Sequence, residues 1–144
     1  MSDRFSDRRD RLAKVIGEEG LAVIPASAEQ IRNDDVPHDF RQDSNFFYVT
    51  GFQEPDAVAV LAPGHSEGDY LLFVRPRDPE MEAWNGLRAG VEGAMSEFGA
   101  DSAFNIDELD EVLTRLMIGR EVLWYQTGDS RHDDRVTSIV ARAR

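Results

Sequence analysis

Histidines and carboxylates are the residues of this chain that most often support acid–base or metal chemistry. The chain has 28 acidic residues and three histidines, which are His38, His65 and His132. The histidines lie far apart in the sequence, and none belongs to a His-Glu-x-x-His pattern or a similar metal-binding spacing. An abundance of carboxylates is by itself weak support for acid–base catalysis. We therefore predict no catalytic residue and no metal ligand in these 144 residues.

A polar segment, residues 26–45, contains the first pattern of side chains suited to binding. It includes the runs Arg32-Asn33-Asp34-Asp35 and Arg41-Gln42-Asp43-Ser44. Arginine offers a planar fork that matches a carboxylate, while Asn, Asp and Ser close local turns by bonding the backbone. Two interpretations remain open, because the segment could be a polar loop with internal Arg–Asp pairs or the wall of a binding pocket. A long loop of this kind in a compact domain is often functional.

The second such pattern is the run Trp84-Asn85-Gly86-Leu87-Arg88-Ala89-Gly90. An indole beside glycines and an arginine suits a mobile loop that buries its ring against a partner, since Trp and Arg are favoured as interface anchors. The alternative is a tryptophan packed within its own domain. The sequence alone leaves both possibilities open.

Composition limits the class of protein. A chain of 144 residues with 41% hydrophobic content fits one globular domain. The net charge of −12 argues against nucleic acid binding, which needs a basic surface. The sequence lacks cysteine, an apolar run long enough for a transmembrane helix, and the apolar core of a signal peptide. We therefore predict a cytoplasmic protein without a membrane or nucleic acid partner.

The first half of the chain must position these polar segments. An amphipathic helix is predicted over residues 4–19, with Phe5, Leu12, Val15 and Ile16 on one face. A short buried strand follows at 21–24. Three further strands are predicted at 46–50, 57–62 and 69–74, the first because aromatic and β-branched residues suit a pleated surface. Short links between these three strands predict an antiparallel meander.

The second half alternates helices and strands. Asp78-Pro79 is typical of a helix start, so a short helix is predicted from there to about residue 84 or 85, ended by Gly86. The remaining elements are predicted as helices at 91–98, 106–117 and 130–144 and strands at 103–105 and 121–125. The whole order predicts an α/β fold with a mixed sheet flanked by helices. The last helix lacks a capping glycine, so we interpret the chain as one that was cut near Arg144.

These segments together resemble the N-terminal domain of the Xaa-Pro aminopeptidases (aminopeptidase P), of the creatinase/prolidase group. The residues that carry the resemblance are the opening helix from Phe5 to Leu12, Arg32-Asn33 with Asp35, the run from Arg41 to Pro55, Leu72 to Pro79, and Trp84 to Gly90. It covers essentially the whole chain in the right order. One departure is His38-Asp39, where members of the family commonly have Tyr-Pro.

The resemblance implies a fold of the creatinase/aminopeptidase P N-terminal type, which is ribonuclease H-like. It implies that residues 1–144 are this one domain and that a C-terminal catalytic domain of pita-bread fold is absent from this chain. That domain binds two divalent metals, usually manganese, whereas the N-terminal domain binds none. The implied substrate is a peptide with proline at the second position, and the implied assembly is a homo-oligomer, either a dimer or a tetramer.

The resemblance also implies which residues line the substrate channel or an interface. These are Arg32, Asn33, Asp35, Arg41, Asn45, Tyr48, Trp84 and Arg88. The loop that carries Trp84 is expected to help close the active site of a neighbouring subunit, and the loop that carries Asp35 is expected to border the channel. Two alternatives remain open. One is a free-standing peptide- or protein-binding module that has lost its catalytic domain, and the other is a related enzyme with a different substrate.

Overall fold

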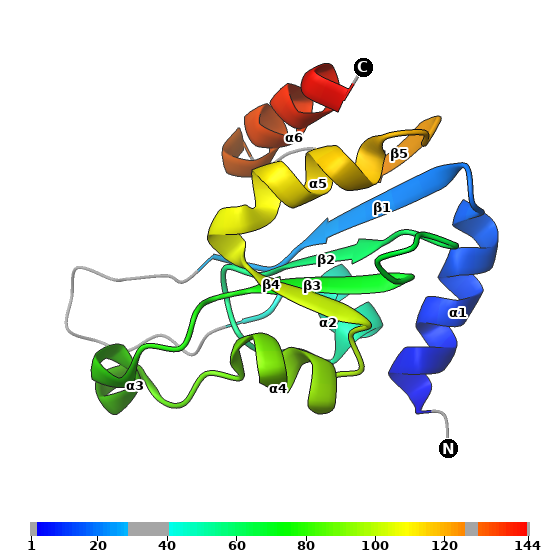
Figure 1. Ribbon diagram of the computed structural model, residues 1–144. Coiled ribbons are helices and arrows are strands. Elements are labelled where there is room, and N and C mark those ends of the chain that lie inside the picture. The colour runs from blue at the N-terminus through cyan, green and yellow to red at the C-terminus, as the bar shows by residue number, and fades with distance from the viewer. Residues whose placement is uncertain (1–2, 29–40, 126–129, 144) are drawn as a thin grey trace.

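A five-stranded sheet forms the centre of the molecule (Figure 1). The structure is a computed structural model that describes residues 3–28, 41–125 and 130–143. The strands are β1 (Gly20–Pro25), β2 (Val58–Leu61), β3 (Tyr70–Val74), β4 (Ser102–Asn105) and β5 (Val122–Tyr125). They lie in the order β4-β3-β2-β1-β5.

The sheet is mixed, as the sequence predicts. β1 pairs with β2 and β2 with β3 in antiparallel fashion, while β1–β5 and β3–β4 are parallel pairs. The register places Val23 opposite Val60 in the first pair and Val60 opposite Leu71 in the second. The predicted fold class is therefore confirmed. The antiparallel meander exists, but its three strands are β1, β2 and β3.

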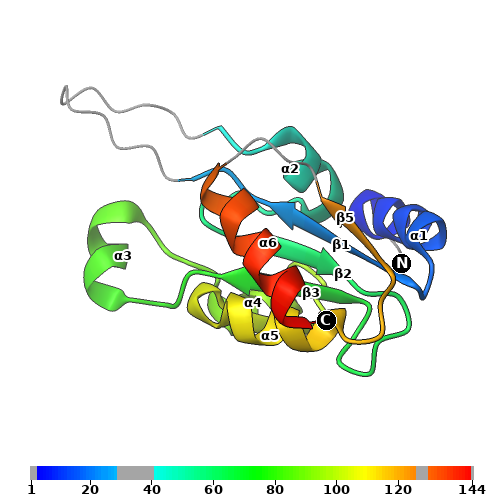
Figure 2. The ribbon, with the colours of Figure 1, turned by 90° about the horizontal axis from the view of Figure 1, so that it is seen from above.

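Helices cover both faces of the sheet (Figures 1 and 2). The helical elements are α1 (Arg4–Ile16), α2 (Ser44–Thr50), α3 (Pro79–Asn85), α4 (Gly90–Ser96), the short 3₁₀ turn η1 (Ile106–Glu108), α5 (Leu109–Met117) and α6 (Ser130–Ala143). α1, α2 and α4 contribute to one apolar cluster, and α5 and α6 contribute to the other. β2 shows why the strands are apolar throughout, because Ala59 and Leu61 join the first cluster while Val58 and Val60 join the second.

The predicted strand at 46–50 is wrong, because these residues belong to helix α2. The Asp43 carboxylate caps the helix by accepting a hydrogen bond from the Phe46 N–H at 2.9 Å. Gly51 ends it with φ of 69° and ψ of 8°, the left-handed conformation that glycine adopts without strain. Phe46, Val49 and Thr50 are buried at helical spacing. The helical caps and this periodicity therefore outweigh the strand propensity of an aromatic run.

The other predicted elements are confirmed with small shifts at their ends. The opening helix ends at Ile16, with Gly17 as its cap, so it is shorter than predicted. The Asp78 side chain accepts hydrogen bonds from the Glu80 and Met81 N–H groups, which makes it the N-cap of α3 as expected. In the part of the chain that is described, no helix is both long enough and apolar enough to cross a membrane.

Candidate functional sites: the α2 hollow and the α3 arm

The start of α2 is fixed by Gln42, a side chain that is only 8% exposed. Its Oε1 accepts hydrogen bonds from the Ser27 and Asp43 N–H groups, both at 2.9 Å. Its Nε2 donates to the carbonyls of Phe52 at 3.2 Å and Glu54 at 2.8 Å. One amide therefore joins the end of β1, the start of α2 and the segment that enters β2. Gln42 lies in the run Arg41-Gln42-Asp43-Ser44 that the sequence analysis highlighted, but it was not predicted as a site residue, because a glutamine gives no sign in the sequence of being buried.

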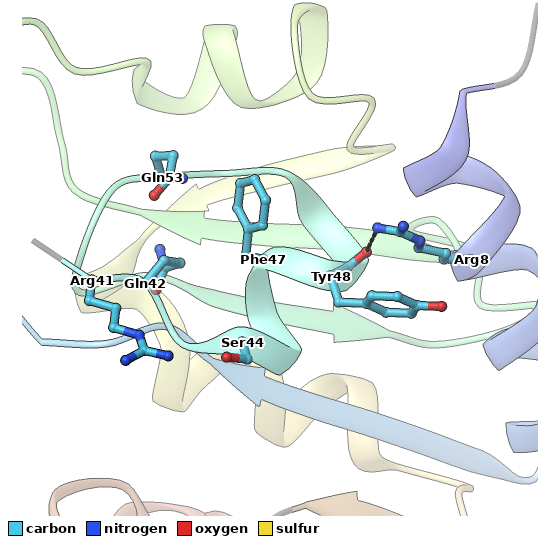
Figure 3. A pocket seen from close by; sticks show the side chains of 7 residues that line it. All are labelled: Arg8, Arg41, Gln42, Ser44, Phe47, Tyr48 and Gln53. Carbon is cyan, nitrogen blue, oxygen red and sulfur yellow. Dashed lines mark hydrogen bonds between the residues drawn. The ribbon is translucent and has the colours of Figure 1, made fainter.

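An open hollow of about 600 Å³ lies along α2, next to this network (Figure 3). We call it the α2 hollow, and it is lined by Arg8, Arg41, Gln42, Ser44, Phe47, Tyr48 and Gln53. Arg8 reaches it from α1. Its guanidinium carbon lies 3.9 Å from the centre of the Tyr48 ring, and its Nη1 donates to the Tyr48 carbonyl at 3.1 Å. The ring and the cation thus hold each other at one side of the hollow.

The structure brings three of the predicted site residues to the exposed side of α2. Arg41 and Tyr48 line the hollow, and Asn45 is exposed on the same helix. Four residues that were singled out in the preceding loop, Arg32, Asn33, Asp35 and His38, lie outside the described residues. Their predicted place at a channel or an interface therefore stays a prediction.

The second candidate surface is formed by residues 79–89, here called the α3 arm. In Figures 1 and 2, α3 lies away from the sheet and from the other helices. The exposed fractions are 43% for Met81, 87% for Trp84 and 82% for Leu87. The alternative of a tryptophan packed within its own domain is therefore wrong for this structure. An exposed apolar group of this kind is typical of an interaction surface.

The base of the α3 arm is held by buried or half-buried carboxylates. Glu82, which is 9% exposed, accepts from Arg77 Nε at 2.9 Å and Nη2 at 3.1 Å and from the Arg88 N–H at 3.1 Å. The hydrogen bond from Arg77 is the main cause that lowers the pKa of the Glu82 carboxyl below its ordinary value. Glu54 accepts from Arg75 at 3.3 Å and from the Ala89 N–H at 2.8 Å. The exposed tip of the arm, which consists of Met81, Trp84 and Leu87, is therefore attached to an ordered base.

Arg88, predicted as a channel or interface residue, belongs to this base. Its Nη1 donates to the Pro76 carbonyl at 3.0 Å, so the side chain folds back on the strand exit and does not extend from the tip. Gly90 follows with φ of 68°, and a Cβ at that position would lie 2.6 Å from Arg77 Cγ. The close approach of Arg77 thus requires glycine where the arm returns to the body. Sequence reasoning missed Glu54, Arg77 and Glu82, although the first two fall within the segments it singled out.

The described residues offer no site for a metal ion, because they contain no group of three or more His, Cys, Asp or Glu side chains that could hold one. His65 has a structural role, since its Nδ1 accepts a hydrogen bond from the Glu67 N–H at 3.0 Å. The sequence predicts no Gly-x-Ser-x-Gly nucleophile elbow, although residues 64–68, Gly-His-Ser-Glu-Gly, match that motif. They lie in the turn between two antiparallel strands, β2 and β3, and not between a strand and a helix as a nucleophile elbow requires.

The domain is thus a mixed sheet flanked by helices with two candidate surfaces, the α2 hollow and the α3 arm. A family model described as aminopeptidase P, N-terminal domain, matches residues 5–124. The chain therefore belongs to the aminopeptidase P N-terminal domain family.

Individual relatives agree with this assignment. The chain is 35% identical to Xaa-Pro aminopeptidase of Haemophilus influenzae, over 85% of this chain and 29% of the relative. It is 34% identical to Xaa-Pro aminopeptidase of Escherichia coli, over 90% of this chain and 30% of that protein. This chain thus spans less than a third of the length of these curated relatives.

Solved structures give the same result. Aminopeptidase PepP of Pseudomonas aeruginosa superposes with a TM-score of 0.89 and 44% identity, over 95% of this chain and 31% of that chain. A variant of Escherichia coli aminopeptidase P in complex with substrate superposes with a TM-score of 0.87 and 33% identity, over 96% of this chain and 32% of that chain. The similarity in sequence and in fold covers nearly all of this chain.

Proposed function

We propose that this chain is the non-catalytic N-terminal domain of a metal-dependent Xaa-Pro aminopeptidase, which removes the N-terminal residue that precedes proline. The match of residues 5–124 to the family model is the observation that carries this proposal. The relatives are about three times as long as this chain, which leaves room in them for a second domain.

The second domain is proposed to be a C-terminal catalytic domain that holds two divalent metals, with manganese as the expected ion. The residues described here do not fit such a site. Two metals in that domain would supply an activated water for attack on the peptide bond before proline. The expected partners of this chain are its own catalytic domain, further copies in a dimer or tetramer, and the peptide substrate, all in the cytoplasm.

The two candidate surfaces have separate roles in this proposal. The α3 arm carries Trp84 toward the active site of a neighbouring subunit, and its exposed apolar tip together with its ordered base supports that role. The α2 hollow, with Arg41 and Tyr48, forms part of the channel wall together with Asn45. The loop residues Arg32, Asn33 and Asp35 are proposed to border the same channel.

Peptidase assays with manganese test the proposal. The assay compares two samples, residues 1–144 and the product of the full reading frame that encodes them. Each receives a peptide with proline at the second position. We expect turnover from the full product alone, since the chemistry belongs to the second domain. Cleavage by residues 1–144 would contradict a non-catalytic role, and an inactive full product would contradict the aminopeptidase.

A second candidate is a free-standing peptide- or protein-binding module. The exposed apolar tip of the α3 arm favours it, because such a tip could hold a partner without any catalytic domain. The reading frame after Arg144 separates the two. A following set of Asp, His and Glu metal ligands supports the aminopeptidase, whereas a stop codon at that point supports the module.

A further inference from the structure

The α2 hollow is positively charged in a strongly acidic chain. Of the described residues that line it, Arg8 and Arg41 are cationic and none is acidic. The chain as a whole has a net charge of −12. A basic hollow on an acidic protein attracts a ligand with a few negative charges, whereas the overall charge repels a polyanion such as nucleic acid.

The polar groups around the hollow differ in how many contacts they already make within the domain. Gln42 makes four hydrogen bonds to backbone groups, so its amide belongs to the structure of the wall. Arg8 is held in place by the ring and carbonyl of Tyr48. Arg41 is exposed, and among the described residues no hydrogen bond or ion pair fixes its guanidinium. The hollow therefore combines one positioned cation with one that is available to a ligand.

The arrangement of these groups indicates the shape of the ligand. Figure 3 shows Arg41 and Arg8 at opposite sides of α2, with Ser44 and Tyr48 between them. The rings of Phe47 and Tyr48 add apolar surface to the lining. Because the hollow is open and its cations are separated, it suits an extended segment with acidic side chains better than a compact anion. The guanidinium fork of Arg41 matches a carboxylate in a bidentate contact.

We propose that the α2 hollow binds an extended peptide segment that carries carboxylate side chains. Arg41 pairs with a carboxylate of the ligand, Arg8 supplies the second positive charge, and Phe47 and Tyr48 contact the apolar part of the segment. The inference names the ligand class of a surface that the proposed function places in the channel wall, so it rests on that function for its biological role. The binding itself requires only the 144-residue chain.

Fluorescence anisotropy on residues 1–144 tests this proposal with two labelled peptides. One contains two glutamates, the other has glutamines in the same positions, and neither has proline at its second position. We expect the glutamate peptide to bind about tenfold more tightly at low salt, because charge-assisted hydrogen bonds are stronger than neutral ones. Raising the ionic strength should remove most of this difference.

Variants locate the site. Arg41→Gln should abolish most of the preference for glutamate, and Arg11→Gln, which changes an exposed arginine of α1 outside the hollow, should leave it intact. Thermal unfolding monitored by circular dichroism shows that each variant is folded. Equal binding of the two peptides, or a preference that survives Arg41→Gln, would overturn the proposal.

Inorganic phosphate is a further probe in the same assay. If phosphate at equal concentration displaces the glutamate peptide as well as the unlabelled peptide does, the hollow is a simple anion site and the peptide proposal is overturned. Weak displacement supports an extended ligand. Because the probes lack proline and no turnover is measured, their result is independent of whether the full-length protein proves to be an aminopeptidase.

Discussion

The α2 hollow and the α3 arm both present an aromatic ring at the surface, but the two rings have different surroundings. Tyr48 is 52% exposed, and the Arg8 guanidinium lies over its ring at 3.9 Å. Trp84 is 87% exposed, and among the described residues no cation or aromatic ring lies over it. The ring at the hollow is thus already covered by a cation of its own chain, whereas the tip of the arm has its apolar surface in water.

This difference supports the proposal that the α3 arm contacts a partner. Burial of apolar side chains stabilises a protein by about 25 cal/mol for each Å² removed from water, so Trp84 and Leu87 contribute little to the fold of this chain. The base of the arm is nevertheless ordered by the contacts of Glu54 and Glu82. An ordered base beneath an exposed apolar tip is expected where the tip is covered in an assembly.

The largest expected effect is on stability. It tests whether α2 belongs to the hydrophobic core, in contrast to the α3 arm. Phe46 is fully buried and packs edge-on against Phe52, with ring centres 6.4 Å apart. Phe46→Ala should lower the free energy of unfolding by about 3–5 kcal/mol, because it removes a large buried ring and leaves a cavity. Urea unfolding of residues 1–144 measures this effect. A loss below about 1 kcal/mol would show that α2 is not part of the core.

The next effect concerns the wall of the hollow. Gln42→Ala leaves two backbone N–H groups and two carbonyls without their partner, and should cost about 2–3 kcal/mol in unfolding free energy. Gln53→Ala is the matched control, because Gln53 lines the same hollow but is exposed. The control should change stability by less than about 0.5 kcal/mol in the same urea titration. Equal losses would mean that Gln42 does not organise the hollow.

The same two regions show what the sequence could and could not predict. Asp78 before Pro79 was recognised as a helix start, and α3 begins there. Asp43 is likewise the N-cap of α2, and Gly51 is its C-cap. The aromatic run between them nevertheless favoured a strand. The caps and the buried spacing of Phe46, Val49 and Thr50 were the signals that could have identified this helix.

The side-chain networks were harder to predict than the elements. The contacts of Gln42 join segments up to 15 residues apart, and those of Glu54 with Ala89 join positions 35 residues apart. Such contacts depend on how the chain returns to itself, which local patterns do not specify. The exposure of Trp84 was left open for the same reason, because a turn with two glycines permits either packing.

A smaller effect should appear at the base of the arm as the pH changes. The pKa of Glu82 is lowered from 4.5, chiefly by the hydrogen bond from Arg77, so the charged pair stabilises the folded arm above about pH 4.5. That contribution is lost as the pH falls through the lower pKa of the folded state. We expect hydrogen exchange at the Arg88 amide, which donates to Glu82, to become faster relative to its intrinsic rate in that range.

Glu82→Gln tests the cause of this pH dependence. The variant should show the faster Arg88 exchange already at neutral pH and should not change further on acidification. Exchange at amides of β2, which lies in the centre of the sheet, serves as the internal control. If the variant keeps the protection and the pH dependence of the original chain, another group holds the arm.

The smallest effect on stability should come from the most exposed ring. In residues 1–144, Trp84→Ala should change the unfolding free energy by less than about 0.5 kcal/mol, because the side chain has so little contact with the domain. Trp124→Ala is the matched control, since Trp124 is 50% exposed on β5 and its indole Nε1 lies near Gly20. The control should lose more stability.

In the full-length protein we expect the opposite order for peptide turnover, because Trp84→Ala should impair turnover more than Trp124→Ala. A Trp84→Ala variant that loses stability and turnover together would mean that the arm serves the fold of its own chain and not an assembly.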